Sequence, residues 1–377
     1  MSNFPALVYS QRLAKAAQLA REAGLDGLIF GTGAELAYLT GAWLSTHERL
    51  TALVIPASGR PSFILPGVDR GDLAKSAIPE LDVAVIGWED GDSPHQLTVA
   101  ALGEKSAQPR VGVGSELTAD HLLKLQDLLG GHAGCTVLAS MLLRELFMRK
   151  DEPEIVQLRE AGAAIDRVHA AVPGLLQPGR TERDVAGDLE RLIYQEGHSA
   201  IDFIIVGSGP NGANAHHDFS DRVLETGDVV VVDIGGTWGA GYHSDCTRTY
   251  VVGGPTALEN PEFARLYEVL ERAQAAAVAA VRPGVAAKDI DQVARDIITE
   301  AGYGAQFIHR TGHGIGLSTH EEPFIMAGND LVLEPGMAFS VEPGIYVEGK
   351  FGARIEDILV VTEDGAEALN RNPHGLQ

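Results

Sequence analysis

Acidic residues interrupt two strongly apolar segments in the second half of this 377-residue chain. Asp233 follows a run of four valines, and Glu342 follows the apolar segment Ala338–Val341. Both segments have the composition of buried strands, in which an isolated charge is costly unless a partner compensates it. The fold therefore has to bring a compensating group to each of these two carboxylates.

Each apolar segment leads through a glycine-containing turn into a returning strand that carries a second acidic residue. Asp233 and Asp245 are equidistant from Gly239, and Glu342 and Glu356 are likewise equidistant from a glycine in their turn. Directly opposed residues of an antiparallel pair have Cβ atoms about 4.5–5.5 Å apart. We therefore expect two carboxylates side by side in each hairpin, which is unfavourable unless a cation lies between them.

The second half of the chain also contains a weak internal repeat. Pro-Gly pairs at 178–179 and 283–284 precede expected helices at an offset of 105 residues, and a carboxylate hairpin follows in each copy. Thr181 is an expected helix N-cap, as is Asn260 with Pro261 at the first helical position. Two copies of a helix followed by an antiparallel hairpin, with carboxylates at matched positions, favour a metal centre of two ions.

Short apolar segments and helical patterns alternate over the first 140 or so residues, which predicts an α/β domain with a mixed sheet. The expected helices are residues 10–24 and Thr118–Leu129, and the expected strands are Gly27–Phe30, Ala52–Pro56, Ser62–Leu65, Val83–Ile86 and Val111–Val113. The charged segment Arg149–Glu154 then opens a helix that continues to about Val172. We place the domain boundary there and expect one domain over residues 1–145 and a second over 150–377.

Histidines are concentrated between the two hairpins. The segment from His309 to Pro323 also contains His313 and His320, among glycines that permit close approach of the backbone. His216 lies at the corresponding point of the first copy of the repeat. Imidazoles beside paired carboxylates are typical of metal ligands and of groups that move protons.

The composition limits the partners and the compartment. The formal net charge of −23 repels phosphate backbones and anionic membranes, so we expect neither nucleic acid nor a membrane as a partner. No apolar run approaches the roughly 20 residues of a membrane helix, and the first eleven residues do not resemble a signal peptide. Cys135 and Cys246 cannot form a disulfide framework, so we expect a cytoplasmic protein.

These motifs resemble those of the pita-bread metallopeptidases, specifically the prolidase and aminopeptidase P branch. The resemblance covers about residues 150–365, and the first domain is similar to the family's creatinase-type domain through its Tyr38–Gly41 signature. The fold implied is a mixed α/β domain followed by a pseudo-symmetric pita-bread α+β domain. The motifs that carry the resemblance are Asp233 with Asp245, His313-Gly-Ile-Gly, His320-Glu-x-Pro323, Glu342-Pro-Gly and Arg354-Ile-Glu356-Asp. One departure is Ala215, where relatives often have proline.

The resemblance implies five metal ligands for two divalent ions. Asp233 would bind one ion, His313 and Glu342 would bind the other, and Asp245 and Glu356 would bridge the two. A hydroxide between the metals would attack the peptide carbonyl. Oxygen ligands with one imidazole and no thiolate suit Mn²⁺ best, with Co²⁺ or Zn²⁺ as alternatives.

The resemblance also implies residues that act on the substrate. His216 and His320 would stabilise the tetrahedral intermediate and assist proton transfer, and Arg354 would anchor the substrate. We add His309 as a substrate contact, because it belongs to the histidine segment. Arg49, in the loop Trp43–Arg49, is a further candidate cation for a substrate carboxylate.

The sequence leaves several functions open within this fold. We favour hydrolysis of Xaa-Pro dipeptides, with an aminopeptidase P that acts on longer Xaa-Pro peptides as the alternative. A methionine aminopeptidase shares the ligands but typically lacks the first domain, and a creatinase lacks the full ligand set. A non-enzymatic pita-bread binding module would have lost its ligands, which are intact here. The family habit implies a homodimer formed through the first domain.

Overall fold

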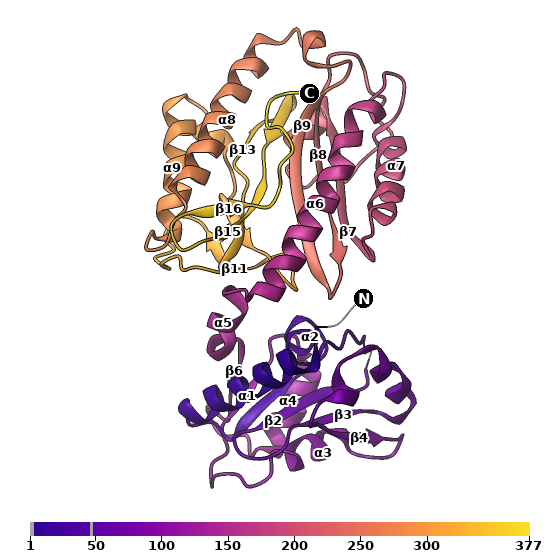
Figure 1. Ribbon diagram of the computed structural model, residues 1–377, viewed down its shortest axis with the longest axis vertical. Coiled ribbons are helices and arrows are strands. Elements are labelled where there is room, and N and C mark those ends of the chain that lie inside the picture. The colour runs from indigo at the N-terminus through magenta and orange to yellow at the C-terminus, as the bar shows by residue number, and fades with distance from the viewer. Residues whose placement is uncertain (1–3, 46–47) are drawn as a thin grey trace. The chain divides into compact units, whose positions relative to one another are not determined.

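The computed structural model describes residues 4–45 and 48–377. The chain divides into two compact units, Met1–Leu146 and Phe147–Gln377 (Figure 1). Within the described residues, no helix has the length and apolar character needed to cross a membrane.

The first unit is built on a mixed six-stranded sheet in the order β4-β3-β2-β1-β5-β6. The β1–β2 and β2–β3 pairs are antiparallel, and the other pairs are parallel. The strands are β1 (Gly27–Phe30), β2 (Ala52–Pro56), β3 (Ser62–Pro66), β4 (Ala84–Trp88), β5 (Val111–Val113) and β6 (Thr136–Leu138). The helices are α1 (Ala6–Glu22), α2 (Ala34–Thr40), η1 (Gly67–Lys75), η2 (Ile78–Glu80), α3 (Pro94–Ala100), α4 (Ala119–Leu128) and α5 (Ser140–Met148).

The predicted α/β class with a mixed sheet is therefore confirmed for this unit. β1, β2 and β5 have the bounds expected from the sequence, because each is a short apolar segment between Gly, Pro or polar residues. Their alternate side chains, Ile29, Val54 and Val111, pack with Leu125 of α4 in one buried core.

The second unit contains three antiparallel β elements and four long helices among its described residues. The first sheet consists of β7 (Ala200–Ser208), β8 (Val229–Trp238) and β9 (Tyr242–Val251). The second, in the order β11-β10-β12-β15-β16, consists of β10 (Gly312–Gly314), β11 (Glu321–Ile325), β12 (Ala338–Val341), β15 (Asp357–Val361) and β16 (Ala366–Ala368). The hairpin is formed by β13 (Gly344–Val347) and β14 (Phe351–Arg354).

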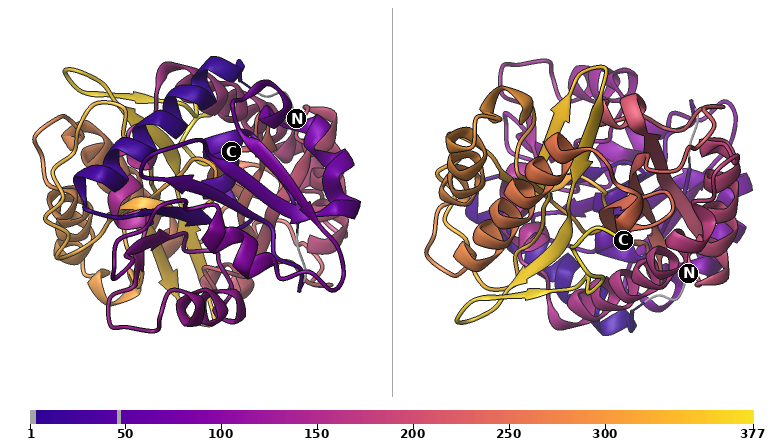
Figure 2. Two further views of the ribbon diagram at one scale, coloured as in Figure 1. Left: turned by 90° about the horizontal axis from the view of Figure 1, so that it is seen from below. Right: turned by 90° about the horizontal axis from the view of Figure 1, so that it is seen from above.

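Two pairs of helices flank these strands (Figure 2). α6 (Glu152–Leu175) and α7 (Glu182–Gln195) pack against the first sheet, whereas α8 (Pro261–Ala280) and α9 (Ala287–Glu300) pack against the second. Short 3-10 turns connect them: η3 (Gly209–Ala213), η4 (Pro255–Ala257) and η5 (Gly304–Gln306). Each half of the second unit thus consists of a pair of helices and a sheet, in agreement with the internal repeat expected from the sequence.

The expected helix start signals of the second unit are present. The Thr181 side chain accepts from the backbone N–H of Asp184, and the Asp184 side chain accepts from Thr181 in return. Asn260 accepts from two backbone N–H groups at the start of α8, where Pro261 occupies the first helical position. Side-chain acceptors of this kind satisfy N–H groups that have no partner inside the helix.

The predicted register of the first hairpin is wrong by two residues. Asp233 lies opposite Thr247, and Asp245 lies opposite Gly235. The turn is centred on Ala240, because the glycines at 235 and 236 continue the strand instead of entering the turn. A shift of two residues keeps each side chain on its original face of the sheet, so the two carboxylates still face the same side.

The second hairpin keeps the register expected from the sequence, although its ladder is interrupted. Val341 lies opposite Asp357 in the β12–β15 pair, and Gly344 lies opposite Arg354 in the β13–β14 pair. Both pairs are centred on Gly349. Glu342 and Glu356 lie in the gap between these two ladders, where neither carboxylate belongs to a continuous strand pair.

Candidate metal centre

A cavity of ≈620 Å³ in the second unit contains most of the site residues predicted from the sequence. Both hairpins and the histidine segment contribute to its walls. The predicted residues that line it are Asp233, Asp245, His313, Glu342 and Glu356, together with His216, His309, His320 and Arg354. The structure therefore brings side chains that are up to 140 positions apart in the sequence into one cavity.

The cluster at the centre of the cavity consists of two carboxylates and one imidazole. Ligand atoms of Asp245, His313 and Glu356 all lie within 4.8 Å of one another, and the three residues are buried. His313 Nε2 lies 3.2 Å from Glu342 Oε1 and 3.7 Å from Asp245 Oδ2. Distances of this size allow one cation to contact several of these groups at once.

Glycines let the strand that carries His313 lie close to its neighbours. A Cβ atom on Gly312 would lie 1.8 Å from the Ser340 carbonyl oxygen, and one on Gly314 would lie 2.3 Å from the Glu322 carbonyl oxygen. The backbone N–H of His313 donates to Ser340 Oγ at 3.0 Å. The glycines on both sides of His313 are therefore required by packing, which explains the His-Gly segment of the motif.

Burial and neighbouring charges shift the pKa values of these carboxylates in opposite directions. Burial raises the pKa of Asp245 well above its usual range, and the charges of Glu356, Asp233 and Glu342 raise it further. Burial and the charges of Glu342 and Asp233 do the same to the pKa of Glu356. Burial would also raise the pKa of Glu342, but the hydrogen bond and charge of His313 outweigh it and lower that pKa to about 2.

These donors fit divalent cations. Asp233, which lines the same cavity, has a buried Oδ1 without a hydrogen-bond partner, so this acceptor lacks compensation from the protein. Carboxylate oxygens with a single imidazole are the ligands of hard or borderline ions such as Mn²⁺ and Zn²⁺. The centre belongs to the class of sites that hold divalent metal ions between carboxylates.

Arg354 lies beside Asp233 and is surrounded by hydrogen-bond acceptors of the protein. Its guanidinium donates to Asp233 Oδ2 at 2.7 Å, to the Tyr346 hydroxyl at 2.7 Å and to Thr247 Oγ1 at 3.0 Å. It also donates to the carbonyl oxygen of Ala215 at 3.2 Å. Four partners hold the side chain in place, so its first effect is to fix Asp233, and direct contact with substrate stays a prediction.

The remaining histidines lie in the walls of the cavity. The His320 ring lies 3.9 Å, centroid to centroid, from that of His313, and partial burial beside it lowers the pKa of His320 to about 4. His309 is more constrained, because its Nε2 lies 2.9 Å from the Tyr346 hydroxyl. His216 is exposed and lines the cavity. Its sequence neighbour His217 contacts Glu182 instead, with His217 Nε2 2.9 Å from Glu182 Oε2.

One residue of the cavity, Arg310, was missed by the sequence reasoning. Its guanidinium lies over the ring of Phe324, 4.4 Å from the centroid, and the residue lines the cavity. Within the described residues, it forms no ion pair with a carboxylate. The signal was present in the sequence, because Arg310 lies between His309 and His313 in the motif that marks the site.

Arg49 belongs to the first unit and has a partner there. Its guanidinium lies 2.9 Å from Asp90 Oδ1 and packs over the ring of Trp88. Part of the proposed loop, Thr46 and His47, lies outside the described residues. The contribution of Arg49 to substrate binding therefore stays a prediction.

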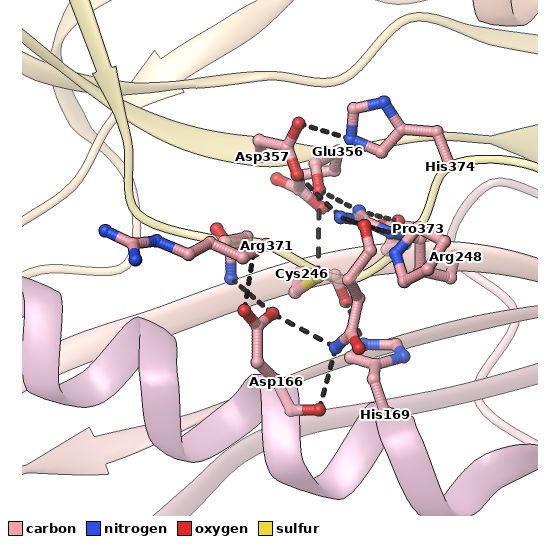
Figure 3. Close-up of polar contacts among 12 residues, drawn as sticks. Asp166, His169, Cys246, Arg248, Glu356, Asp357, Arg371, Pro373 and His374 are labelled. Atoms are coloured by element: carbon pink, nitrogen blue, oxygen red, sulfur yellow. Dashed lines mark hydrogen bonds and ion pairs between the residues drawn. The ribbon is translucent and has the colours of Figure 1, made fainter.

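A buried polar network contacts the backbone of Glu356 (Figure 3). Arg248, which is 1% exposed, donates to the carbonyl oxygen of Glu356 at 2.6 Å and to Asp357 Oδ1 at 2.7 Å. It also donates to the carbonyl oxygen of Asn372 at 2.9 Å. The side chain thus connects β9, the start of β15 and the C-terminal segment next to Glu356.

A second cavity, of ≈650 Å³, shares Ala215, His216 and His309 with the first. Its other walls include Ile308 and Val347. The two cavities thus have a common wall in the second unit.

Comparison with known proteins identifies the family. Residues 156–363 match metallopeptidase family M24, and residues 12–145 match the creatinase/prolidase N-terminal domain. The chain therefore belongs to metallopeptidase family M24, so the resemblance inferred from the motifs is confirmed. It is an enzyme of the pita-bread fold with a creatinase-type N-terminal domain.

Three similar proteins cover nearly the whole chain. "Probable dipeptidase PepE" of Mycobacterium tuberculosis is 55% identical over 99% of this chain and 97% of the relative. An Xaa-Pro dipeptidase of Lactobacillus helveticus is 36% identical over 91% of this chain and 92% of the relative. The crystal structure of dipeptidase PepE from Mycobacterium ulcerans is 53% identical, with a TM-score of 0.94, and covers 100% of this chain and 99% of that one.

Proposed function

We propose that this metallopeptidase is an Xaa-Pro dipeptidase, which hydrolyses the bond between an N-terminal residue and proline. The observation that carries the proposal is Arg310, a cation in the wall of the ≈620 Å³ cavity without a carboxylate partner among the described residues. A dipeptide presents a free carboxylate one residue beyond the cleaved bond, and such a charge needs a cation when it is buried. The names of the two curated relatives, a dipeptidase and an Xaa-Pro dipeptidase, support this reaction.

We propose that five donors in the wall of this cavity hold two divalent ions. Asp233 would bind one ion, His313 and Glu342 the other, and Asp245 and Glu356 both. When bound, such ions lower the pKa of a water molecule toward neutrality and stabilise negative charge on the carbonyl oxygen. The oxygen-rich donor set supports Mn²⁺ as the native ion, and metal analysis of the purified protein tests this choice.

The histidines in the cavity wall would transfer protons and stabilise the negative charge that develops on the substrate. Because its pKa is lowered to about 4, His320 is neutral near pH 7 and offers both a donor and an acceptor nitrogen. We propose that His320 and His216 stabilise the tetrahedral intermediate and assist proton transfer to the leaving proline nitrogen. His309, held by Tyr346, would form part of the substrate wall.

Arg310 would recognise the proline carboxylate. Its guanidinium lies over the ring of Phe324, and this contact would restrain the side chain while its N–H groups bind an acceptor. Arg354 would act mainly by holding Asp233. We keep Arg49 as a further candidate for this carboxylate, and an Arg49→Ala variant with unchanged substrate preference would remove it from the proposal.

Substrate length tests the proposal. With the Mn²⁺-loaded protein, we expect a higher kcat/KM for Leu-Pro than for Leu-Pro amide. Arg310→Gln should lower kcat/KM for the dipeptide by roughly 10–100-fold, the loss of a hydrogen bond to a charged group, and affect the amide little. The exposed Arg282 provides a matched control, because Arg282→Gln should change neither value. Faster cleavage of the amide than of the dipeptide would overturn the dipeptidase assignment.

The second cavity supports the alternative, an aminopeptidase P that acts on longer peptides. Its volume of ≈650 Å³ and its shared wall with the metal centre provide room for residues beyond proline. Faster hydrolysis of Leu-Pro-Gly than of Leu-Pro would favour this reading. Filling the second cavity with Ala305→Trp should then slow the tripeptide and leave the dipeptide unchanged.

Three further properties complete the proposal. We assign the two domains to residues 1–145 and 150–377, a homodimer as the assembly and the cytoplasm as the location. The buried free cysteines Cys135 and Cys246 are compatible with a reducing compartment. Analytical ultracentrifugation of the purified chain tests the homodimer.

A further inference from the structure

Glu182 is a fully buried carboxylate outside the metal centre. It occupies the first position of α7, directly after the N-cap Thr181, and is 0% exposed. α7 lies beside β7, the strand that leads into the segment carrying His216 (Figure 1). A buried carboxylate that no proposed catalytic step uses requires an explanation, because its burial is costly without strong partners.

Four residues of the His216 segment and its flanks donate to this carboxylate. Oε1 accepts from Ser208 N–H at 2.7 Å and from Ser208 Oγ at 2.6 Å, and Asn211 Nδ2 lies 3.0 Å away. Oε2 accepts from Ser220 N–H at 2.8 Å and from Ser220 Oγ at 2.7 Å, and His217 Nε2 lies 2.9 Å away. One side chain therefore holds both ends and the middle of residues 208–220.

This arrangement requires an ionised carboxylate. Burial raises the pKa of Glu182, but the hydrogen bonds from Ser208, Ser220 and His217 outweigh it and lower the pKa to about 2. Every contact is a donor to an acceptor oxygen, so a glutamine at this position would direct an NH₂ group at other donors. A neutral side chain of the same size therefore cannot replace Glu182.

His216 depends on this segment for its position. Among the described residues, its imidazole forms no hydrogen bond of its own, and only its backbone N–H has a partner, Asn214 Oδ1 at 3.2 Å. Its sequence neighbour His217 is the member of the pair that contacts Glu182. The carbonyl oxygen of Ala215 accepts from Arg354 on the other side. The backbone around His216 is thus fixed between Glu182 and Arg354.

We propose that Glu182 is a positioning residue for His216: it holds residues 208–220 so that the His216 imidazole faces the metal centre. Glu182 touches neither the cavity nor a proposed metal ligand, and it acts only through the segment that it anchors. The inference rests on the proposed catalytic role of His216. It adds Glu182, on α7, to the residues on which the reaction depends.

A double-mutant cycle of Glu182→Gln and His216→Ala tests the proposal in the full-length, Mn²⁺-loaded protein with Leu-Pro as substrate. Glu182→Gln should lower kcat roughly 10–100-fold, as expected for a displaced catalytic group, while KM and metal content change little. In the His216→Ala background the same substitution should change kcat less than about twofold, because the group it positions is already absent. Glu190→Gln, an exposed change on the same helix, is the matched control and should leave kcat unchanged.

The outcomes separate the positioning role from the proposed function. The positioning role would be overturned if Glu182→Gln lowered kcat by the same factor in the unmodified protein and in the His216→Ala variant. A normal kcat in the Glu182→Gln variant would also overturn it. A normal kcat in His216→Ala would instead remove His216 from catalysis and the positioning role with it, whereas absence of Leu-Pro hydrolysis in the unmodified protein would reject the dipeptidase itself.

A milder variant covers the case in which Glu182→Gln does not fold. Ser220→Ala removes one hydroxyl donor and keeps the carboxylate, so it should give a smaller kcat loss that again disappears in the His216→Ala background. Hydrogen exchange gives a readout without catalysis. In the metal-free Ser220→Ala protein, amides of residues 209–218 should exchange faster than in the unmodified protein, and unchanged exchange there would contradict the anchoring role.

Discussion

Arg354 and Asp233 form a buried ion pair in which Arg354 Nη2 lies 2.7 Å from Asp233 Oδ2. The second oxygen of Asp233 is buried without a hydrogen-bond partner. The guanidinium thus fixes one side of the carboxylate, and the other side remains for a different positive group. Partners of this kind orient metal ligands, and their loss typically lowers metal affinity by roughly 10–100-fold.

We therefore predict that Arg354→Lys weakens metal binding. A lysine ammonium cannot reach Asp233, Tyr346 and Thr247 together, so Asp233 loses its fixed orientation. Calorimetric titration of the metal-free protein with Mn²⁺ should show one of two sites weakened by roughly 10–100-fold. Unchanged Mn²⁺ affinity with a raised KM for Leu-Pro would show instead that Arg354 anchors the substrate directly.

Replacement of Asp245 should raise the stability of the metal-free protein and abolish the activity of the metal-loaded protein. Burial and three neighbouring carboxylates raise its pKa, so in the metal-free protein the Asp245 charge is a source of repulsion. Asp245→Asn should abolish hydrolysis and raise the Tm of the metal-free protein by about 2–4 °C, the shift for 1 kcal/mol in a domain of this size. Asp127→Asn, an exposed change in the first unit, is the control and should alter neither quantity. Retention of near-normal turnover with saturating Mn²⁺ would contradict the two-metal assignment.

His320 is predicted to act on the substrate and not as a ligand. Its ring packs on that of His313, and its lowered pKa of about 4 keeps the imidazole neutral near pH 7. His320→Ala should therefore lower kcat by roughly 10²–10⁴-fold, the range for acid–base or oxyanion groups, with unchanged metal content. Loss of one metal equivalent, measured by atomic emission, would make His320 a ligand instead.

The parts of this structure that were predictable from the sequence are those determined locally. The bounds of β1, β2 and β5 follow from short apolar segments between breakers, and the start of α7 follows from Thr181. The four carboxylates Asp233, Asp245, Glu342 and Glu356 were also singled out, because charges inside apolar strands are conspicuous, and all four line one cavity.

The register of the first hairpin was not predictable in the same way. Glycines at 235 and 236 can belong to a strand or a turn. The choice depends on tertiary packing, because a Cβ atom would clash with Ser244 and Phe203 at position 235 and with the Ala200 carbonyl oxygen at position 236. Glu182 was missed for a related reason. Its significance arises from partners 26 to 38 positions away in the sequence, Ser208 and Ser220 among them, which local patterns do not reveal.

Asp357 should be important for stability because it compensates Arg248. The two side chains are 2% and 1% exposed and lie 2.7 Å apart. Asp357→Ala should lower the free energy of unfolding by about 3–5 kcal/mol, because it leaves a buried guanidinium without its counter-charge. Combining it with Arg248→Met should restore part of that loss, as measured by urea unfolding. A double variant less stable than Asp357→Ala would contradict charge compensation as the main role of the pair.

Glu182 should make the protein sensitive to acid in a specific pH window. Its folded-state pKa of about 2 lies below the ordinary value near 4.5, so the ionised carboxylate stabilises the fold above about pH 4.5. That contribution, about 3 kcal/mol, is lost as the pH falls from about 4.5 toward 2. In the Glu182→Gln variant, the side chain at position 182 does not titrate. The difference in unfolding free energy between the unmodified metal-free protein and this variant should therefore shrink as denaturant unfolding is repeated at pH 6, 4 and 3. Glu190→Gln, which is exposed, should show no such convergence. A difference that stays constant over this range would mean that the Glu182 carboxylate is not held by its donors in the folded protein.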